Sequence, residues 1–262
     1  MKLISEALQA SGNTILSPTP IEFHGHDNVT FWEDPTFCFP QCDNTKTCVY
    51  SMTRIYPLPS ALKGKLINLF CPPSRDDKAH NRLIRRGHHL ARLLLGCPES
   101  NPNRDAPQKN FETYNFPLTR GRAEQLGIDT TLLSGEMGRM LAQFHMTARN
   151  DARGIEVVLG ANITNVFDPR RHREPRVWVI DFNQVKDFDF TENQIPLLID
   201  GFFMNEAYFP RARPVDPLYN TFSKAYIEEC YKIGEVAGQL GCKFIVALEA
   251  EQARKDASRA GE

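Results

Sequence analysis

The feature that most constrains this sequence is a long amphipathic helix pattern followed by two short apolar runs, both bordered by acidic residues. Across Thr130–Arg149, apolar side chains recur every three or four positions, which is the spacing of one helix face. The run Ile155–Leu159 follows and is closed by Gly160, and a second run, Val177–Ile180, ends on Asp181. Both runs have the length of buried strands. The order helix, acidic loop, strand, connection, strand, acid predicts an α+β fold.

The first 56 residues differ from the rest of the chain in the pattern of their apolar side chains. Residues 2–10 have helical composition and end at a Gly-Asn pair, whereas residues 20–32 and 48–55 alternate apolar and polar side chains. We therefore expect residues 1–56 to form a short helix beside a small antiparallel sheet.

Residues 57–248 are mainly helical in pattern. The apolar stripe across residues 81–95 and the segments 195–203 and 218–237 all have the spacing or length of helices. Residues 249–262 are charged, and we expect this tail to fray.

Charge and hydropathy exclude several classes of protein. The formal net charge is -1, so no global field attracts nucleic acid or an anionic membrane. The longest apolar runs are too short to cross a bilayer, and the N-terminus lacks the apolar stretch of a signal peptide. We expect an intracellular protein, cytoplasmic or nuclear, whose partner the sequence does not identify; a protein partner is one candidate, and neither a membrane nor a nucleic acid is expected.

A cysteine cluster near the N-terminus raises the question of a zinc site. Cys38, Cys42 and Cys48 follow His24 and His26, within a total of seven cysteines that we expect to be reduced. A structural zinc ion needs four converging ligands, usually in closely spaced pairs, and the His-x-His pair is a poor second pair. The spacing favours plain thiols, and a zinc or nucleic-acid-associated factor remains an alternative.

The order of acids around the two strands resembles the catalytic half of the protein-kinase-like fold. In that fold an Asp-x4-Asn loop precedes one strand, and an Asp-Phe-Gly motif follows the next. The resemblance implies that Asp151 is the catalytic base and that Arg153 stands where many kinases keep a Lys beside the transferred phosphate. It also implies that Asp181 and Glu156 are ligands of Mg²⁺ in an ATP site, with Asn183 in place of the motif's Gly.

Each acid also has a structural interpretation. Asp181 could cap the end of a strand, and Asp151 could be an ordinary loop acid. Glu156 could pair with Arg153 or with the basic run at residues 170–173. The shared order of the three acids favours the descendant of a metal-nucleotide site, whether active or not.

A second resemblance covers roughly residues 45–225. The segments MGRMLAQFH, IEVVLG, VWVIDFNQ and FFMNEAYFPRARP together look like a fungal family of domains of unknown function that carry a zinc-finger-like label. No activity can be carried over from that family, and the ligand spacing in this chain does not support the label.

The phosphate-holding half of a kinase is missing from the pattern. The sequence contains no G-x-G-x-x-G motif, and only Lys2 and Lys46 occur in the first 50 residues. Residues 1–56 would then be a partial N-terminal lobe and residues 57–248 a helical C-terminal lobe, either because the sequence is truncated or because the protein is a reduced version. The sequence thus favours a kinase-like pseudoenzyme or regulatory binding protein, and an active phosphotransferase is the alternative.

Overall fold

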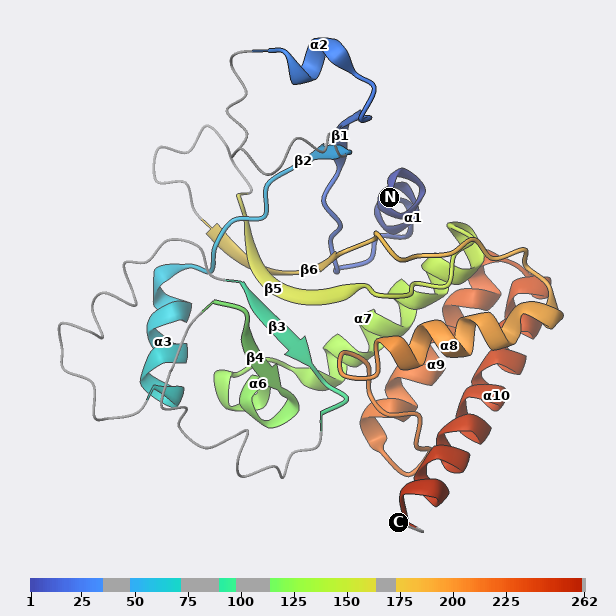
Figure 1. Ribbon diagram of the computed structural model, residues 1–262. Helices are drawn as coiled ribbons and strands as arrows, with labels where there is room; N and C mark the ends of the chain where they lie inside the picture. The colour runs from blue at the N-terminus through green and yellow to red at the C-terminus, as the bar shows by residue number, and fades with distance from the viewer. Residues whose placement is uncertain (35–47, 72–89, 98–113, 164–172, 261–262) are drawn as a thin grey trace.

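A four-stranded sheet and a group of helices share one hydrophobic core (Figure 1). The computed structural model describes residues 1–34, 48–71, 90–97, 114–163 and 173–260. The described helices are α1 (Lys2–Ser11), α2 (Val29–Trp32), α3 (Ser60–Phe70), α6 (Arg120–Leu126), α7 (Thr130–Ala142), the π-helical turn η1 (Gln143–Thr147), the 3-10 turn η2 (Glu192–Gln194), α8 (Ile195–Met204), α9 (Pro217–Ile233) and α10 (Glu235–Ala260). The described strands are β1 (Pro20–His24), β2 (Val49–Met52), β3 (Ala91–Leu94), β4 (Phe116–Thr119), β5 (Glu156–Ile163) and β6 (Arg173–Ile180). The predicted α+β class is confirmed.

The larger sheet brings the two predicted acidic strand ends together. Its strand order is β4-β3-β5-β6, with β3 parallel to β4 and antiparallel to β5. Strands β5 and β6 are antiparallel, and their register places Glu156 opposite Ile180. Asp181 therefore follows directly on the residue that faces Glu156 across the pair.

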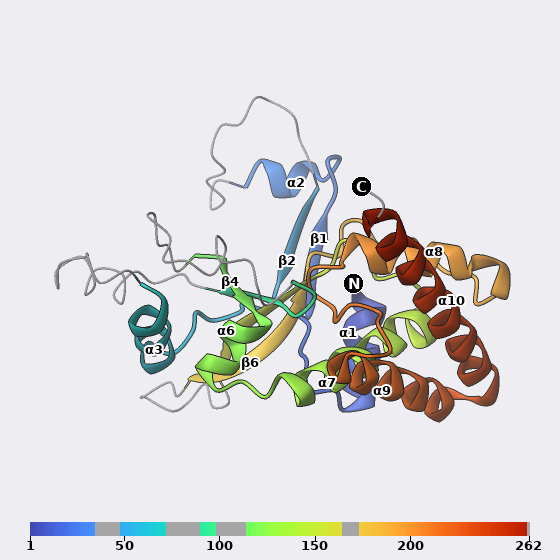
Figure 2. The ribbon, with the colours of Figure 1, turned by 90° about the horizontal axis from the view of Figure 1, so that it is seen from below.

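Close packing of α7 on α9 fixes the helical layer. A Cβ atom at Gly138 would lie 2.2 Å from the main-chain oxygen of Phe222, so only glycine allows this approach. Asp side chains cap the N-termini of both helices: Asp129 accepts a hydrogen bond from the Leu132 N–H, and Asp216 accepts one from the Leu218 N–H. Helices α8 and α10 pack against each other on the same side of the sheet (Figure 2).

The N-terminal segment docks against the middle of the chain. Helix α1 ends at Gly12, which has a left-handed φ of 66°. Leu16 then extends the sheet at β6, since its N–H donates to Val177 O at 2.9 Å and its carbonyl accepts from Val179 N–H at 2.8 Å. The β1–β2 pair and α2 stand apart from helices α7 to α10 in both views (Figures 1 and 2).

Most predicted elements are present, and three expectations are wrong. The described end of the 81–95 stripe contains the strand β3, in which the buried Ala91 and Leu93 alternate with the half-buried Arg92 and Leu94. The predicted extended segment 20–32 ends in the short helix α2, because the Asn28 side chain accepts from Phe31 N–H and caps it.

The third correction concerns the charged tail. Helix α10 continues through residues 249–260, where the predicted fraying does not hold. Asp256 is bound in a bidentate ion pair by Arg213, at 2.7 and 2.8 Å, and Gln252 is buried. These contacts anchor the last turns to the loop before α9. Among the described residues, no helix is long and apolar enough to cross a membrane.

Candidate functional site

Two loops that lie at the ends of β5 and β6 are joined by main-chain hydrogen bonds. Asp151 N–H donates to Lys186 O at 3.0 Å, and Phe188 N–H donates to Arg149 O at 2.8 Å. Gly154 lets the two loops pack closely, because a Cβ atom at this position would lie 2.9 Å from the Gln184 side chain. The acidic loop after η1 and the loop after β6 therefore form one unit.

Asp151 is the centre of this unit and is fully buried. Its Oδ1 accepts from the main-chain N–H groups of Lys186 at 2.9 Å and of Arg153 at 3.1 Å. Its Oδ2 accepts from Arg153 Nε at 3.2 Å. All three bonds are internal to the two loops, so the carboxylate holds the loops together and faces no open cavity.

The neighbouring helix packs directly on the same loop. A Cβ atom at Gly201 of α8 would lie 2.3 Å from Asp151 O. Asn205, just after α8, is also buried, and its side-chain amide donates to Ala152 O at 2.7 Å. The surroundings of the loop compensate for its unusual backbone, in which Arg149 and Ala152 have left-handed φ values of 56° and 52°.

Glu156 belongs to a second group of side chains, which we call the Arg92–Glu156–Tyr208 cluster. Arg92 of β3 forms an ion pair with Glu156 at 2.8 Å, and the Tyr208 hydroxyl lies near the same carboxylate. Burial, followed by the nearby charge of Glu156, raises the pKa of Tyr208 to about 12. Tyr208 is therefore a protonated hydrogen-bond donor across the physiological range.

Asp181 stands beside this cluster and is exposed. Its negative charge contributes to the raised pKa of Tyr208, which places the two side chains near each other. Its backbone has a left-handed φ of 65°, an uncommon conformation for a residue other than glycine. Within the part of the chain that the structure describes, its carboxylate has neither a hydrogen-bond donor nor an ion-pair partner. Asn183, two residues on, is also exposed.

These positions allow the predicted magnesium ligands to be tested against the geometry. Mg²⁺ takes about six oxygen ligands and often keeps several waters or phosphate oxygens among them. Asp181 could supply such an oxygen, but Glu156 is already neutralised by Arg92. In the described ranges, no three His, Cys, Asp or Glu side chains are grouped so as to hold a metal ion. Of the two predicted magnesium ligands, Asp181 has a carboxylate that is available to a metal ion, whereas the carboxylate of Glu156 is paired with Arg92.

The described members of the alternative zinc-ligand set lie in a different part of the molecule from the acidic loops. Both ring nitrogens of His24 have partners, Glu22 at 3.1 Å and Asn28 at 3.2 Å, and the ring stacks on Phe31. Cys48 is exposed. The other candidate cysteines, at positions 38 and 42, lie outside the described residues, so the structure does not test the full set.

Sequence reasoning missed Arg92 and Tyr208 as members of the site. Arg92 lay in a predicted helix, and Tyr208 lay in the segment FFMNEAYFPRARP, to which we assigned no site residue. In the same segment, Arg211 donates to Gly96 O at 3.0 Å. The signal that could have been used is the short alternation in β3, which places Arg92 next to β5.

Comparison with known proteins gives a match to a family model over part of the chain. A family model of unknown function, described as zinc finger protein, matches residues 177–237, from β6 to the start of α10. The matched segment includes Asp181 and Tyr208 but begins at residue 177, whereas the range expected from the sequence begins at about residue 45. It contains one cysteine, Cys230, and no histidine, so it cannot by itself supply the four ligands of a structural zinc site.

Two further comparisons gave no relatives. No curated protein and no solved structure matches the chain. The site must therefore be interpreted from its own geometry.

Proposed function

We propose that this chain is a kinase-like regulatory binding protein that does not transfer phosphate. The proposal starts from the order of α7, the Asp151 loop, β5, β6 and Asp181, which is the order of the catalytic half of a kinase. The order of these elements supports the kinase-like architecture, and the contacts of the site side chains support the absence of phosphate transfer.

The state of the Asp151 carboxylate is the observation that carries this proposal. A general base must reach the proton of the acceptor hydroxyl, directly or through one water. Asp151 is fully buried and accepts three hydrogen bonds from Arg153 and Lys186. A base in that position has no free lone pair directed at a substrate. Arg153, the residue in the place of a phosphate-binding Lys, is engaged by the same carboxylate.

The ion pair between Arg92 and Glu156 supports the same conclusion. A second metal ligand would have to exchange a guanidinium partner at 2.8 Å for the ion. Breaking such a charge-assisted hydrogen bond reduces the free energy of metal binding, relative to a carboxylate that has no partner to lose.

Phosphate release from ATP in the presence of Mg²⁺ tests the proposal. We expect the wild type and Asp181→Asn to release phosphate at the same background rate. Asp187→Asn is the matched control, because Asp187 is an exposed acid in the same loop. A wild-type rate at least about tenfold above that of Asp181→Asn, with Asp187→Asn unchanged, would show an active phosphotransferase and reject the proposal.

Binding of ATP–Mg²⁺ without transfer is a second candidate function, favoured by the exposed and unpaired carboxylate of Asp181. A ligand at 100 times its dissociation constant stabilises a protein by about 2.7 kcal/mol, which a thermal shift detects. We expect a shift in the wild type and in Asp187→Asn and none in Asp181→Asn. Equal melting temperatures with and without ATP–Mg²⁺ would remove this candidate and leave the first unaffected.

A further inference from the structure

Two arginines and a tyrosine gather at the end of β5 that is remote from Glu156, and we call them the Arg54–Tyr56–Arg173 cluster. The guanidinium carbon of Arg54 lies 5.7 Å from the centre of the Tyr56 ring, and that of Arg173 lies 5.6 Å from the same centre. Both arginines are exposed, whereas the tyrosine is half-buried. The cluster therefore places two positive charges at the surface around one aromatic ring.

The register of the strands explains why these three side chains meet. Tyr56 exchanges two main-chain hydrogen bonds with Ala161 of β5, at 2.8 and 3.1 Å, and Ala161 is paired with Pro175 of β6. Residues opposite each other share a face of a sheet, as do residues two apart along a strand. Arg54 precedes Tyr56 by two residues, and Arg173 precedes Pro175 by two residues. The backbone thus directs all three members of the cluster to one face.

Nothing in the described ranges neutralises these two charges. Neither Arg54 nor Arg173 has an ion-pair or hydrogen-bond partner there, and the Tyr56 hydroxyl forms no hydrogen bond within the same ranges. Glu174, the acid next to Arg173, is instead bound to Arg176 at 2.8 Å. The cluster therefore presents several donors and no acceptor, which is the arrangement that an anion requires.

A third cation lies close to the cluster. Lys63 of α3 is 7% exposed. Burial, followed by the nearby charge of Arg173, lowers its pKa. The positive potential at this end of the sheet therefore extends below the surface.

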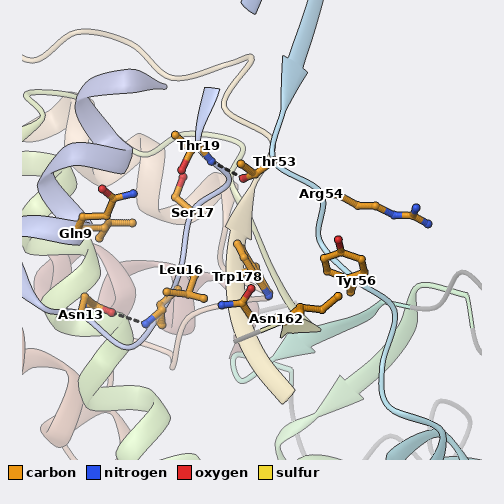
Figure 3. A pocket seen from close by; sticks show the side chains of 13 residues that line it. Gln9, Asn13, Leu16, Ser17, Thr19, Thr53, Arg54, Tyr56, Asn162 and Trp178 are labelled. Atoms are coloured by element: carbon orange, nitrogen blue, oxygen red, sulfur yellow. Dashed lines mark hydrogen bonds between the residues drawn. The ribbon is translucent and has the colours of Figure 1, made fainter. Parts of the chain in front are cut away.

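A hollow of about 610 Å³ adjoins the cluster, and Arg54 and Tyr56 lie at its edge (Figure 3). Its other walls are the end of α1, residues 13–19, and the paired strands β5 and β6. The volume is within the roughly 300–1,000 Å³ of small-molecule sites. Apolar side chains such as Leu16 and Ile163 alternate with hydroxyl and amide groups, and Arg54 supplies the one charge among the described lining residues.

We propose that the Arg54–Tyr56–Arg173 cluster binds the phosphate group of a small organic phosphate, whose uncharged part lies in the adjoining hollow. A phosphate monoester carries a charge of about −1.5 to −2 at pH 7, which matches two guanidinium groups. Arginine binds phosphate oxygens through paired N–H donors, and the Tyr56 hydroxyl donates a further hydrogen bond. The site is at the opposite end of β5 from Glu156 and does not depend on the function proposed for the acidic loops.

Ligand-observed saturation-transfer NMR with phenyl phosphate tests the proposal. We expect saturable binding with a dissociation constant on the order of 1 mM. Phenol has the same ring without the phosphate group and should bind at least about tenfold more weakly. Inorganic phosphate should displace phenyl phosphate, but only at several times its concentration, because it leaves the hollow empty.

Charge variants locate the binding. Arg54→Gln and Arg173→Gln should each weaken the binding of phenyl phosphate at least about tenfold, and Tyr56→Phe should weaken it about threefold. The matched control is Arg254→Gln, which removes an exposed charge on α10 and should leave the affinity within about twofold of the wild type. Circular dichroism checks that each variant is folded.

Several results would overturn the proposal. These are no saturable binding of phenyl phosphate, equal binding of phenol, and wild-type affinity in the folded Arg54→Gln and Arg173→Gln variants. An equal loss of affinity in Arg254→Gln would show general attraction to positive charge and would overturn it as well. Displacement by inorganic phosphate at the concentration of phenyl phosphate would overturn the placement of the uncharged part in the hollow.

Discussion

Asp151→Asn is expected to destabilise the protein strongly, although it changes one atom of a side chain. The asparagine can still accept from the main-chain N–H groups of Lys186 and Arg153 through Oδ1. Its amide nitrogen, however, replaces the oxygen that accepts from Arg153 Nε at 3.2 Å, so two donors then face each other. The guanidinium of Arg153, whose side chain is 18% exposed, is left without its carboxylate.

The size of the effect follows from these contacts. A hydrogen bond to a charged group is worth about 1.5–3 kcal/mol, and two further bonds lose their charged acceptor at about 0.5 kcal/mol each. The expected loss in the free energy of unfolding is therefore roughly 3 kcal/mol, which is within the range for breaking a buried ion pair.

Urea denaturation followed by circular dichroism measures this loss through the midpoint and the slope of the transition. Asp187→Asn serves as the control, since an exposed acid one residue beyond Lys186 should change stability by less than about 0.5 kcal/mol. If Asp151→Asn costs less than about 1 kcal/mol, or no more than Asp187→Asn, the carboxylate does not hold the two loops together. The argument against Asp151 as a catalytic base would fall with it.

Three further predictions concern the helical layer. Gly138→Ala should lower the free energy of unfolding by more than about 2 kcal/mol, because its Cβ would lie 2.2 Å from Phe222 O. Gly64→Ala, whose Cβ would have no other atom within 4 Å, should instead raise it by about 0.5–1 kcal/mol. Thermal denaturation of the two variants measures the difference. Burial lowers the pKa of His145 to about 3, so the native state binds fewer protons than the unfolded state, and the free energy of unfolding should fall by about 2 kcal/mol from pH 7 to pH 5. Urea midpoints measured at the two pH values should show a smaller fall in His145→Gln. An identical fall in the variant and the wild type would contradict the lowered pKa of His145. Arg213→Ala should change global stability by less than about 1 kcal/mol while increasing amide hydrogen exchange near Asp256, and unchanged exchange there would show that the ion pair does not anchor the end of α10.

The sequence predicts the elements with regular apolar spacing and misses those defined by contacts between distant segments. The helix pattern from Thr130 and the two strands that follow it are found in the structure. The stripe that includes β3 was misread because a run such as Leu93-Leu94-Leu95 fits a helix or a buried strand equally well, and only its neighbour β5 decides. The helical tail was missed because its anchor, Arg213, lies 43 residues away from Asp256 in sequence.

The candidate site shows the same division. The order of the helix, the Asp151 loop, the two strands and Asp181 was read from the sequence and is found in the structure, where the adjacent antiparallel strands bring the two loops side by side. The spacing could not show that Asp151 is buried and accepts three hydrogen bonds, since two of its three donors are main-chain N–H groups. Nor could it indicate Arg92 as the partner of Glu156, which the sequence had paired with nearer arginines.

The docking of Leu16 on β6 has a consequence for how the chain folds during synthesis. Leu16 forms its two main-chain hydrogen bonds with Val177 and Val179 of β6. Because these residues lie far apart in sequence, the ribosome makes the N-terminal segment long before it makes β6. At about 5–20 residues per second, that strand is completed roughly 10–30 seconds later. Leu8 and Ile15 are buried in the finished protein, but η1, against which α1 packs, is synthesised more than 120 residues after them, and β6 follows later still. The nascent chain thus carries an apolar N-terminal segment that a chaperone could recognise until residue 180 has left the ribosome.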